Sequence, residues 1–493
     1  MIWHWNWETV WWSFHILSLF LRLESVSWLS YIHPDEFFQT FQPLFNDNVP
    51  WEFQHACRSI VPIKWIQLVV QNLGESPIGS YKLVKLIYSL MTLIAVQVTL
   101  RKLHLRRKDF STALLLADTS YVTLVYQSHT FSNSIETCVL LFTVWIINDM
   151  RKALETKKKR ISSYQLLFLG FLVSFGIFNR VTFVAWLILP SIFVLKYGLQ
   201  NKLQSLLAIQ SFVFFSLVFI AADSYYFTGS INTSTITPLN NLLYNSKISN
   251  LAQHGLHPYY QHILVNYPTM FGPLIFLAFP FTTKNIKSTS FLTVASGMIV
   301  LSLVPHQELR FLIPMVPLWA SCVDISRSTI KKVLLMLWIP FNLVMLVFMG
   351  KLHQGGVVPA MQELQHHSGN SVFWRTYKPP TWFLQNDSLS YINKDEPEFE
   401  NRARNATSPF VIDCMGFEYE SLEPLLADIT ESNGHVLLIA PQNAMLNFKN
   451  TSLHYRQIWS YKWHYSMDHS EFDKYGWEAF KPGIGIFNFT AYL

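Results

Sequence analysis

The sequence predicts a polytopic α-helical membrane protein that ends in a small α/β domain. Of its 493 residues, 51% are hydrophobic and only 14% are charged, whereas soluble domains carry about 25% charged residues. Its 17 Trp, 21 Tyr and 39 Phe are typical of a chain with large bilayer interfaces, where aromatic rings anchor helices. The long apolar runs stop near Gly350, and several later segments alternate as strands do.

About eleven apolar segments are long enough to cross a bilayer, which takes ~17–25 residues of helix. We place the N-terminus in the cytosol and interpret the first segment as a retained signal anchor, because it has no basic n-region and no small-residue cleavage site. Every basic loop then lies on the cytosolic side, as the positive-inside rule requires. The predicted spans are 10–32, 82–100, 110–128, 134–150, 164–178, 181–197, 204–226, 268–282, 288–304, 309–325 and 333–350.

Five N-glycosylation sequons support this topology, because all of them fall on the opposite, luminal side. They begin at Asn232, Asn386, Asn405, Asn450 and Asn488. We therefore expect a membrane domain over residues 1–350, whose first luminal loop is 33–81, and a luminal domain over residues 351–493.

The luminal domain is expected to be α/β, with a helix at 418–430 between strands. It contains no nucleophile motif and no Gly-rich phosphate loop, so we assign it no catalysis. The predicted strands are 409–413, 435–440, 453–463 and 483–492.

The net charge of +6 does not indicate a nucleic-acid partner, because the basic residues lie in the short cytosolic loops. Of the four cysteines, Cys138 and Cys322 fall in apolar segments and suit a helix core. Cys57 and Cys414 are both luminal in this topology, so a disulfide between them is an open possibility. The cysteines show no metal-ligand spacing.

His33, Pro34, Asp35 and Glu36 follow the first predicted span directly. Because a bilayer excludes charge, such a group at its boundary indicates chemistry or transport. One carboxylate can act as a general base on a hydroxyl, while the other orients that hydroxyl or binds the acceptor. The alternative is that the acids only end a helix in water. The rest of the 33–81 loop carries apolar stripes that predict short interfacial helices, which either cover the bundle or guide a lipid substrate.

Two short luminal turns carry cations. His306, Glu308 and Arg310 lie in one, and Arg180 lies in the other. A guanidinium at the membrane boundary can hold a phosphate bidentately, or it can extend to lipid headgroups. Acids, cations and interfacial helices at one lipid boundary together suggest group transfer from a lipid phosphate.

The luminal segment 227–267 contains His257 and Tyr259 among other polar and aromatic residues. Such side chains can bind sugar hydroxyls by hydrogen bonds and stacking. They are equally typical of an aromatic belt at the membrane surface, and the sequence leaves both interpretations open.

Three stretches resemble the dolichyl-phosphate-mannose-dependent mannosyltransferases of the GT-C superfamily. Tyr31-Ile-His-Pro-Asp-Glu-Phe-Phe-Gln39 resembles their first luminal loop, and it is most similar to the subgroup that adds the fourth mannose to glycosylphosphatidylinositol (GPI) precursors. Trp51-Glu-Phe with Arg58-Ser-Ile and Pro62 is similar to a second family run. His306-Gln-Glu-Leu-Arg-Phe-Leu-Ile-Pro314 is similar to a third, in which Leu309 replaces a common proline.

The resemblance implies a GT-C-type bundle of about 11 transmembrane helices in the endoplasmic reticulum membrane. The implied reaction transfers mannose, with inversion and without metal or cofactor, from dolichyl phosphate mannose in α1,2 linkage to the third mannose of a GPI precursor. The expected partners are this donor, the glycolipid acceptor and membrane lipids.

The resemblance also implies roles for single residues. Asp35 would take the acceptor's proton and Glu36 would position the acceptor, although the base can also be Glu36 or His33. Arg310, His306 and Arg180 would stabilise the departing phosphate. The remaining acceptor contacts would come from His33, Glu308, His257 and Tyr259.

Two other functions remain as alternatives. A third-mannose GPI enzyme or an N-glycan mannosyltransferase belongs to the same class of protein. A lipid transporter or scramblase belongs to a different class, and it is less favoured because the charges gather at the luminal rim and not along a path through the mid-bilayer.

Overall fold

The computed structural model describes residues 7–45, 49–104, 106–156, 160–231, 234–253, 255–276, 286–323, 329–367, 369–386, 388–467 and 471–491. The chain forms two compact units. The first comprises Met1–Val26, Pro50–Val69 and Leu83–Val344. The second comprises Ser27–Val49, Val70–Lys82 and Met345–Leu493. The segment that carries His33, Asp35 and Glu36 therefore belongs to the same unit as the C-terminal domain.

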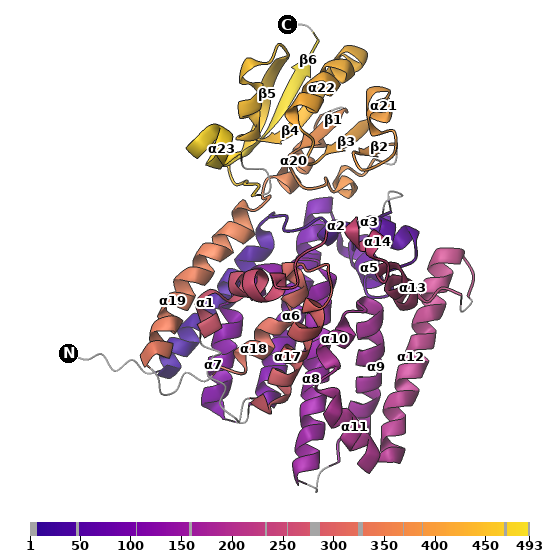
Figure 1. The fold of residues 1–493 in the computed structure, drawn as a ribbon, viewed down its shortest axis with the longest axis vertical. Helices are drawn as coiled ribbons and strands as arrows, with labels where there is room; N and C mark the ends of the chain where they lie inside the picture. Colours follow the sequence, from indigo (N-terminus) through magenta and orange to yellow (C-terminus); the bar gives the residue numbers. More distant parts are fainter. Residues whose placement is uncertain are drawn as a thin grey trace, which may run out of the picture. The chain divides into compact units, whose positions relative to one another are not determined.

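Helices dominate the chain up to residue 352 (Figure 1). Up to the middle of the chain they are α1 (Trp7–Ser27), α2 (Asp35–Phe38), α3 (Gln42–Phe45), α4 (Trp51–Gln54), α5 (Lys64–Leu73), α6 (Pro77–Leu103), α7 (Arg107–Asp118), η1 (Val122–Tyr126), α8 (Ser132–Thr156), α9 (Ser163–Asn179), α10 (Phe183–Leu187), α11 (Ser191–Gln200) and α12 (Lys202–Thr228). They are followed by α13 (Thr237–Asn245), α14 (Ile248–Ala252), η2 (Gln261–Asn266), α15 (Tyr267–Phe271), η3 (Gly272–Phe276), α17 (Thr289–Ser302), η4 (Leu309–Leu312), α18 (Met315–Ala320), α19 (Thr329–Val347) and η5 (Phe348–Leu352).

Three of the described helices are long and apolar enough to cross a membrane: Pro77–Leu103, Lys202–Thr228 and Val333–Leu352. Ser163–Asn179 and Thr289–Ser302 are shorter apolar helices. These helices agree with the predicted membrane protein, while the count of about eleven spans stays a prediction. Residues 277–282 and 324–325 of two predicted spans lie outside the described residues.

Several predicted spans are broken into shorter helices, and prolines and glycines explain the breaks. The predicted span 181–197 forms α10 and α11, separated by a turn that ends at Pro190, which lacks an N–H for the helix ladder. In the predicted span 268–282, Gly272 adopts φ +43°, a value that favours glycine. A Cβ at Gly272 would lie 2.7 Å from the Phe341 ring, so the close approach of this ring also requires a residue without a side chain.

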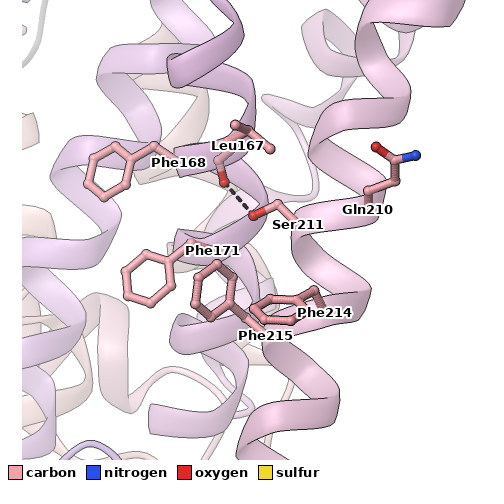
Figure 2. Close-up of a pocket in the computed structure, with 7 residues that line it drawn as sticks. All are labelled: Leu167, Phe168, Phe171, Gln210, Ser211, Phe214 and Phe215. Atoms are coloured by element: carbon pink, nitrogen blue, oxygen red, sulfur yellow. Dashed lines mark hydrogen bonds between the residues drawn. The ribbon is translucent and has the colours of Figure 1, made fainter.

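Helices α9 and α12 pack closely along their length (Figure 1). A Cβ on Gly170 would lie 2.2 Å from the carbonyl oxygen of Ala208, so the absence of a side chain allows this approach. Figure 2 shows a groove beside the crossing, where the Ser211 hydroxyl donates to the carbonyl of Leu167 at 2.6 Å. The groove is otherwise lined by Phe168, Phe171, Gln210, Phe214 and Phe215. None of these side chains is titratable, so the groove contains no acid–base groups.

The C-terminal part of the second unit forms a six-stranded mixed sheet with the order β2-β3-β1-β4-β6-β5. The first four strands in this order are parallel, and β6 runs antiparallel to β4 and β5. The strands are β1 (Ser371–Trp374), β2 (Ser390–Asn393), β3 (Phe410–Cys414), β4 (His435–Pro441), β5 (His454–Tyr461) and β6 (Ile484–Thr490). The helices are α20 (Val357–Leu364), η6 (Thr381–Leu384), α21 (Phe399–Arg404), α22 (Tyr419–Asn433), η7 (Ala444–Asn450), α23 (Phe472–Tyr475) and η8 (Gly476–Phe480).

The predicted α/β domain is confirmed, and β3, β4, β5, β6 and α22 match the five elements expected from the sequence. Leu422, Leu425 and Ile429 of α22 join the core cluster of this sheet, at the 3–4-residue spacing of one helix face. The sequence did not predict β1 and β2.

Cys57 and Cys414 do not form the disulfide that the sequence left open. All four cysteines are free thiols, and Cys57 and Cys414 are both buried. Among the sequons, Asn386, Asn405 and Asn450 are exposed. Asn488 lies in β6, paired on both sides, and its side-chain oxygen is buried. The fifth, Asn232, lies outside the described residues.

Candidate active site

The acid-bearing loop folds around the carboxylate of Glu36. This side chain is fully buried, with 0% of the residue exposed. Its Oε1 accepts the backbone N–H of Ile32 at 2.7 Å and that of His33 at 3.2 Å. Its Oε2 accepts the hydroxyl of Tyr81 at 3.0 Å. A buried carboxylate requires such donors, so Glu36 fixes the path of the backbone that leads to Asp35.

Asp35 and His33, in contrast, reach the surface of the unit. Their side chains are 22% and 34% exposed. The Nδ1 atom of His33 accepts the backbone N–H of Asp35 at 3.2 Å and lies 3.6 Å from Asp35 Oδ1. The amide of Gln39, one turn further along, donates to Asp35 Oδ2. The two side chains are held together at a surface where a substrate hydroxyl can reach them.

The aromatic residues after the acids pack inside the protein. Phe37 and Phe41 are fully buried, and the ring of Phe37 lies 4.8 Å from that of Tyr81, between centroids. The expectation that this stripe lies in the membrane interface is wrong for these two residues, because protein side chains cover them. In α5, Leu68 and Leu73 are exposed while Ile66 is buried, and the interfacial placement of this helix stays a prediction.

In the first unit, Glu308 joins two of the predicted cationic residues. Both carboxylate oxygens accept from the Arg310 guanidinium, through Nε and, at 2.9 Å, through Nη2. Oε1 also lies 2.7 Å from Nε2 of His306. Burial lowers the pKa of His306, but the hydrogen bond and charge of Glu308 outweigh burial, so the pKa is raised above 6.5. The turn therefore presents a guanidinium and an imidazole that favours its protonated form.

Arg180 approaches the same turn through an aromatic ring. Its guanidinium lies 5.0 Å from the centroid of Phe311, and that of Arg310 lies 5.7 Å from it. The Nε atom of Arg180 is 3.5 Å from Glu136, and its Nη1 donates to the Ser132 hydroxyl at 3.0 Å. Burial lowers the pKa of Arg180 to about 10, opposed by the charge of Glu136 and assisted by those of Arg58 and Arg310. Arg180 therefore stays cationic at neutral pH.

His257 and Tyr259 occupy different surroundings. The Nδ1 atom of His257 accepts the backbone N–H of Gln307 at 3.3 Å, and its ring lies 5.7 Å from that of His306. Tyr259 is 64% exposed in the turn before η2. The structure thus brings His257 to the cationic turn, whereas Tyr259 points to the surroundings of the protein.

Sequence reasoning missed several residues of these two sites. Glu136 lies inside a predicted span, and nothing in the sequence around it predicts its pairing with Arg180. Glu52 and Arg58 lie in a run that the family resemblance contained, but their bidentate pairing, at 2.7 and 2.8 Å, was not predicted. Tyr81 lies 45 residues from Glu36 in the chain, so no periodic pattern in the sequence predicts their contact.

The described residues contain no group of three or more His, Cys, Asp or Glu side chains arranged to hold a metal ion. They contain an accessible carboxylate beside a histidine in the second unit, and cationic side chains held by carboxylates in the first. Such groups are suited to deprotonating a hydroxyl and to stabilising a phosphate.

The chain is similar to known proteins over nearly its whole length. Residues 12–385 match the model of the Alg9-like mannosyltransferase family. The chain is 39% identical to GPI mannosyltransferase 4 of Debaryomyces hansenii, with 98% of each chain covered. It is 37% identical to GPI mannosyltransferase 4 of Candida albicans, with 98% of each chain covered. It is 33% identical to that of Saccharomyces cerevisiae, covering 97% of this chain and 98% of the relative.

Among solved structures, the fold is similar to that of ArnT from Cupriavidus metallidurans, crystallised with undecaprenyl phosphate. The TM-score is 0.55 at 9% sequence identity, with 96% of this chain and 97% of ArnT covered. At this low identity the likeness concerns the fold alone, which is of the GT-C type.

Proposed function

This chain belongs to the Alg9-like mannosyltransferase family, and we propose that it adds the fourth mannose to the precursor of the GPI anchor. It is a multi-pass membrane glycosyltransferase of GPI-anchor biosynthesis. The observation that carries the finer assignment is the name GPI mannosyltransferase 4, shared by relatives that align over nearly their full length. The proposed site of action is the lumen of the endoplasmic reticulum, with the N-terminus in the cytosol.

The proposed donor is dolichyl phosphate mannose, and the acceptor is the 2-hydroxyl of the third mannose of the glycolipid. The acceptor oxygen attacks the anomeric carbon of the donor mannose while the bond from that carbon to the phosphate oxygen breaks. The hydroxyl proton moves to a protein base, and the electron pair leaves with dolichyl phosphate. Attack from the face opposite the leaving group converts the β linkage into an α1,2 linkage, so the reaction inverts.

Asp35 is the proposed base. Its carboxylate is partly exposed, whereas that of Glu36 is fully buried and accepts three hydrogen bonds. A general base must come within hydrogen-bond distance of the proton that it removes. We therefore assign Glu36 to holding the loop instead of contacting the acceptor, and His33 to orienting Asp35 at the edge of the acceptor site.

The charge that develops on the leaving phosphate needs cationic stabilisation, because dolichyl phosphate is already a good leaving group and needs no general acid. Arg310 is the first candidate, supported by Arg180 and protonated His306. Glu308 keeps two of these groups in place through its short contacts. We leave His257 and Tyr259 as candidates for sugar contacts, with His257 the better placed of the two.

The lipid that accumulates when the protein is depleted tests the proposed step. If the enzyme adds the fourth mannose, GPI precursors with three mannoses accumulate in depleted cells, and the intact protein restores the four-mannose species. Accumulation of precursors with two mannoses would assign the protein to the preceding step. Loss of N-glycan intermediates with unchanged GPI lipids would move it to the N-glycan pathway.

A further inference from the structure

The connection between β1 and β2 packs against the acid-bearing loop within the second unit. We refer to residues 377–383 of this connection as the 377–383 segment. The ring of Trp382 stacks on Phe41 with centroids 4.4 Å apart, and the ring of Phe383 meets Phe37 at 5.2 Å. Phe37, Phe41 and Phe383 are fully buried. The loop that carries Asp35 thus shares an aromatic core with the C-terminal domain.

Two hydrogen bonds fix the register between the loop and the 377–383 segment. The hydroxyl of Tyr31 donates to the carbonyl oxygen of Lys378 at 2.9 Å. The amide of Gln42 donates to the Thr381 hydroxyl at 2.8 Å, across a sequence separation of 339 residues. Tyr31 and Gln42 are fully buried, and buried polar groups are costly to leave unpaired. The bonds therefore hold the loop on both sides of the acids.

The ring of Tyr377 contacts residues that lie next to the acids. Its ring is 5.9 Å from that of Tyr31 and 6.3 Å from that of His33, between centroids. It is also 5.5 Å from the ring of His353, whose Nε2 lies 3.3 Å from the carbonyl oxygen of Ile32. Tyr377 therefore contacts Tyr31 and His33, which precede the acids in the chain. It also contacts His353, which lies against the backbone carbonyl of Ile32.

The backbone of Tyr377 is fixed in turn by a fully buried glutamine. The backbone N–H of Tyr377 donates to Oε1 of Gln354 at 3.3 Å, and Nε2 of Gln354 donates to the Ser466 hydroxyl at 3.0 Å. Gln354 adopts φ +47°, a strained value for this residue type. A strained backbone conformation persists only where the surrounding structure enforces it. This is expected if Gln354 fixes the position of Tyr377.

We propose that Tyr377 is a positioning residue for mannosyl transfer, through which the C-terminal domain sets the place of Asp35. Its ring holds His33 and Tyr31, and His33 in turn lies against Asp35. A displacement of a catalytic group by about 1 Å can reduce a rate about 100-fold, so a domain without catalytic groups of its own can control the reaction. This inference rests on the proposed function, in which Asp35 is the base.

The test compares Tyr377→Leu, Tyr377→Phe and a control, Tyr455→Leu, in the purified full-length enzyme. Tyr455 lies in β5 of the same domain, where its ring stacks on Phe489. We expect Tyr377→Leu to lower kcat about 10- to 100-fold with little change in the KM for donor or acceptor. Tyr377→Phe keeps the ring and should restore most of the activity, and Tyr455→Leu should leave kcat unchanged.

Hydrogen exchange of residues 31–42 gives a readout that does not depend on activity. Exchange should rise in Tyr377→Leu and stay at the wild-type level in the other two variants. Thr381→Val, which removes the acceptor for Gln42 without changing the side-chain shape, should raise exchange in the same residues and lower kcat, and it serves if Tyr377→Leu does not fold. A wild-type kcat in Tyr377→Leu, or in Thr381→Val where Tyr377→Leu does not fold, would overturn the proposal.

Asp35→Asn in the same assay separates the two claims. If Asp35→Asn abolishes transfer and Tyr377→Leu has the kcat of Tyr455→Leu, only the positioning role fails. If Asp35→Asn keeps transfer, the assignment of the base fails, and the exchange of residues 31–42 still decides whether Tyr377 orders the loop.

Discussion

The hydroxyl of Tyr81 donates a hydrogen bond of 3.0 Å to the carboxylate of Glu36, and both residues are fully buried. Tyr81 lies in the first turns of α6, and Glu36 lies in α2. The bond therefore ties the acid-bearing loop to the start of an apolar helix that is long enough to cross the membrane.

Removal of the Glu36 carboxylate should destabilise the fold and also lower the rate of mannose transfer. Glu36→Ala removes the acceptor of two buried donors and one partly buried donor, so we expect a loss of about 2 kcal/mol or more in the free energy of unfolding. Tyr81→Phe removes one hydrogen bond and should cost about 1 kcal/mol. Thermal unfolding in detergent measures both, with Glu431→Ala on the exposed side of α22 as the control. Equal stability of Glu36→Ala and the control would contradict the supporting role of Glu36.

Loss of Arg310 should impair use of the donor more than use of the acceptor. Arg310→Ala removes the proposed charge-assisted contact to the donor phosphate, and such a contact contributes about 1.5–3 kcal/mol, so the KM for dolichyl phosphate mannose should rise about tenfold or more. The KM for the glycolipid acceptor should change little. Steady-state kinetics with each substrate varied in turn give both values, and Arg404→Ala on α21 is a matched control. An unchanged donor KM would favour the alternative, in which Arg310 extends to lipid headgroups.

The pair of His306 and Glu308 should make stability depend on pH. Because the folded-state pKa of His306 is raised above 6.5, the pair stabilises the protein fully below about pH 6.5, and this contribution is lost as the pH rises through the raised folded-state pKa. The unfolding temperature of the wild type should exceed that of His306→Gln most at low pH, and the two should converge at higher pH. A difference that grows with pH would contradict this assignment.

Much of the fold follows from local patterns, but the contacts that build the site do not. Strands β3 to β6 and helix α22 have clear alternation or helical spacing, so the sequence predicts them. Strands β1 and β2 have four residues each, too few for a periodic signal. The predicted span 181–197 looks continuous by hydropathy, and only the chemistry of Pro190 explains its break.

The chemical groups of the site were visible in the sequence because they are charged and adjoin long apolar segments, where charge is costly. Their roles were less visible, because burial decides them. Asp35 and Glu36 are adjacent in the chain, but one is partly exposed and the other is completely enclosed. Partners such as Tyr81, Tyr377 and Glu136 are brought in by tertiary packing, which leaves no trace in local spacing.

Glycosylation tests the luminal placement of the C-terminal domain. Asn386, Asn405 and Asn450 are exposed, so each Asn→Gln substitution should remove one endoglycosidase-sensitive step in gel mobility. Asn488→Gln should leave the mobility unchanged, because Asn488 lies inside β6, which pairs with a strand on each side. A domain without any endoglycosidase-sensitive glycan at the three exposed positions would contradict the proposed topology.

The most direct test of the central claim is transfer of mannose by Asp35→Asn. Asparagine keeps the size and polarity of the side chain but cannot accept the proton of the acceptor hydroxyl, and a lost general base typically costs about 10²–10⁴-fold in rate. The assay follows transfer from dolichyl phosphate mannose to a GPI precursor with three mannoses, with Asp395→Asn as the control and with unfolding temperature and membrane insertion checked in parallel. The account predicts a folded, inserted Asp35→Asn protein that forms no measurable four-mannose product, and transfer at the wild-type rate would contradict it.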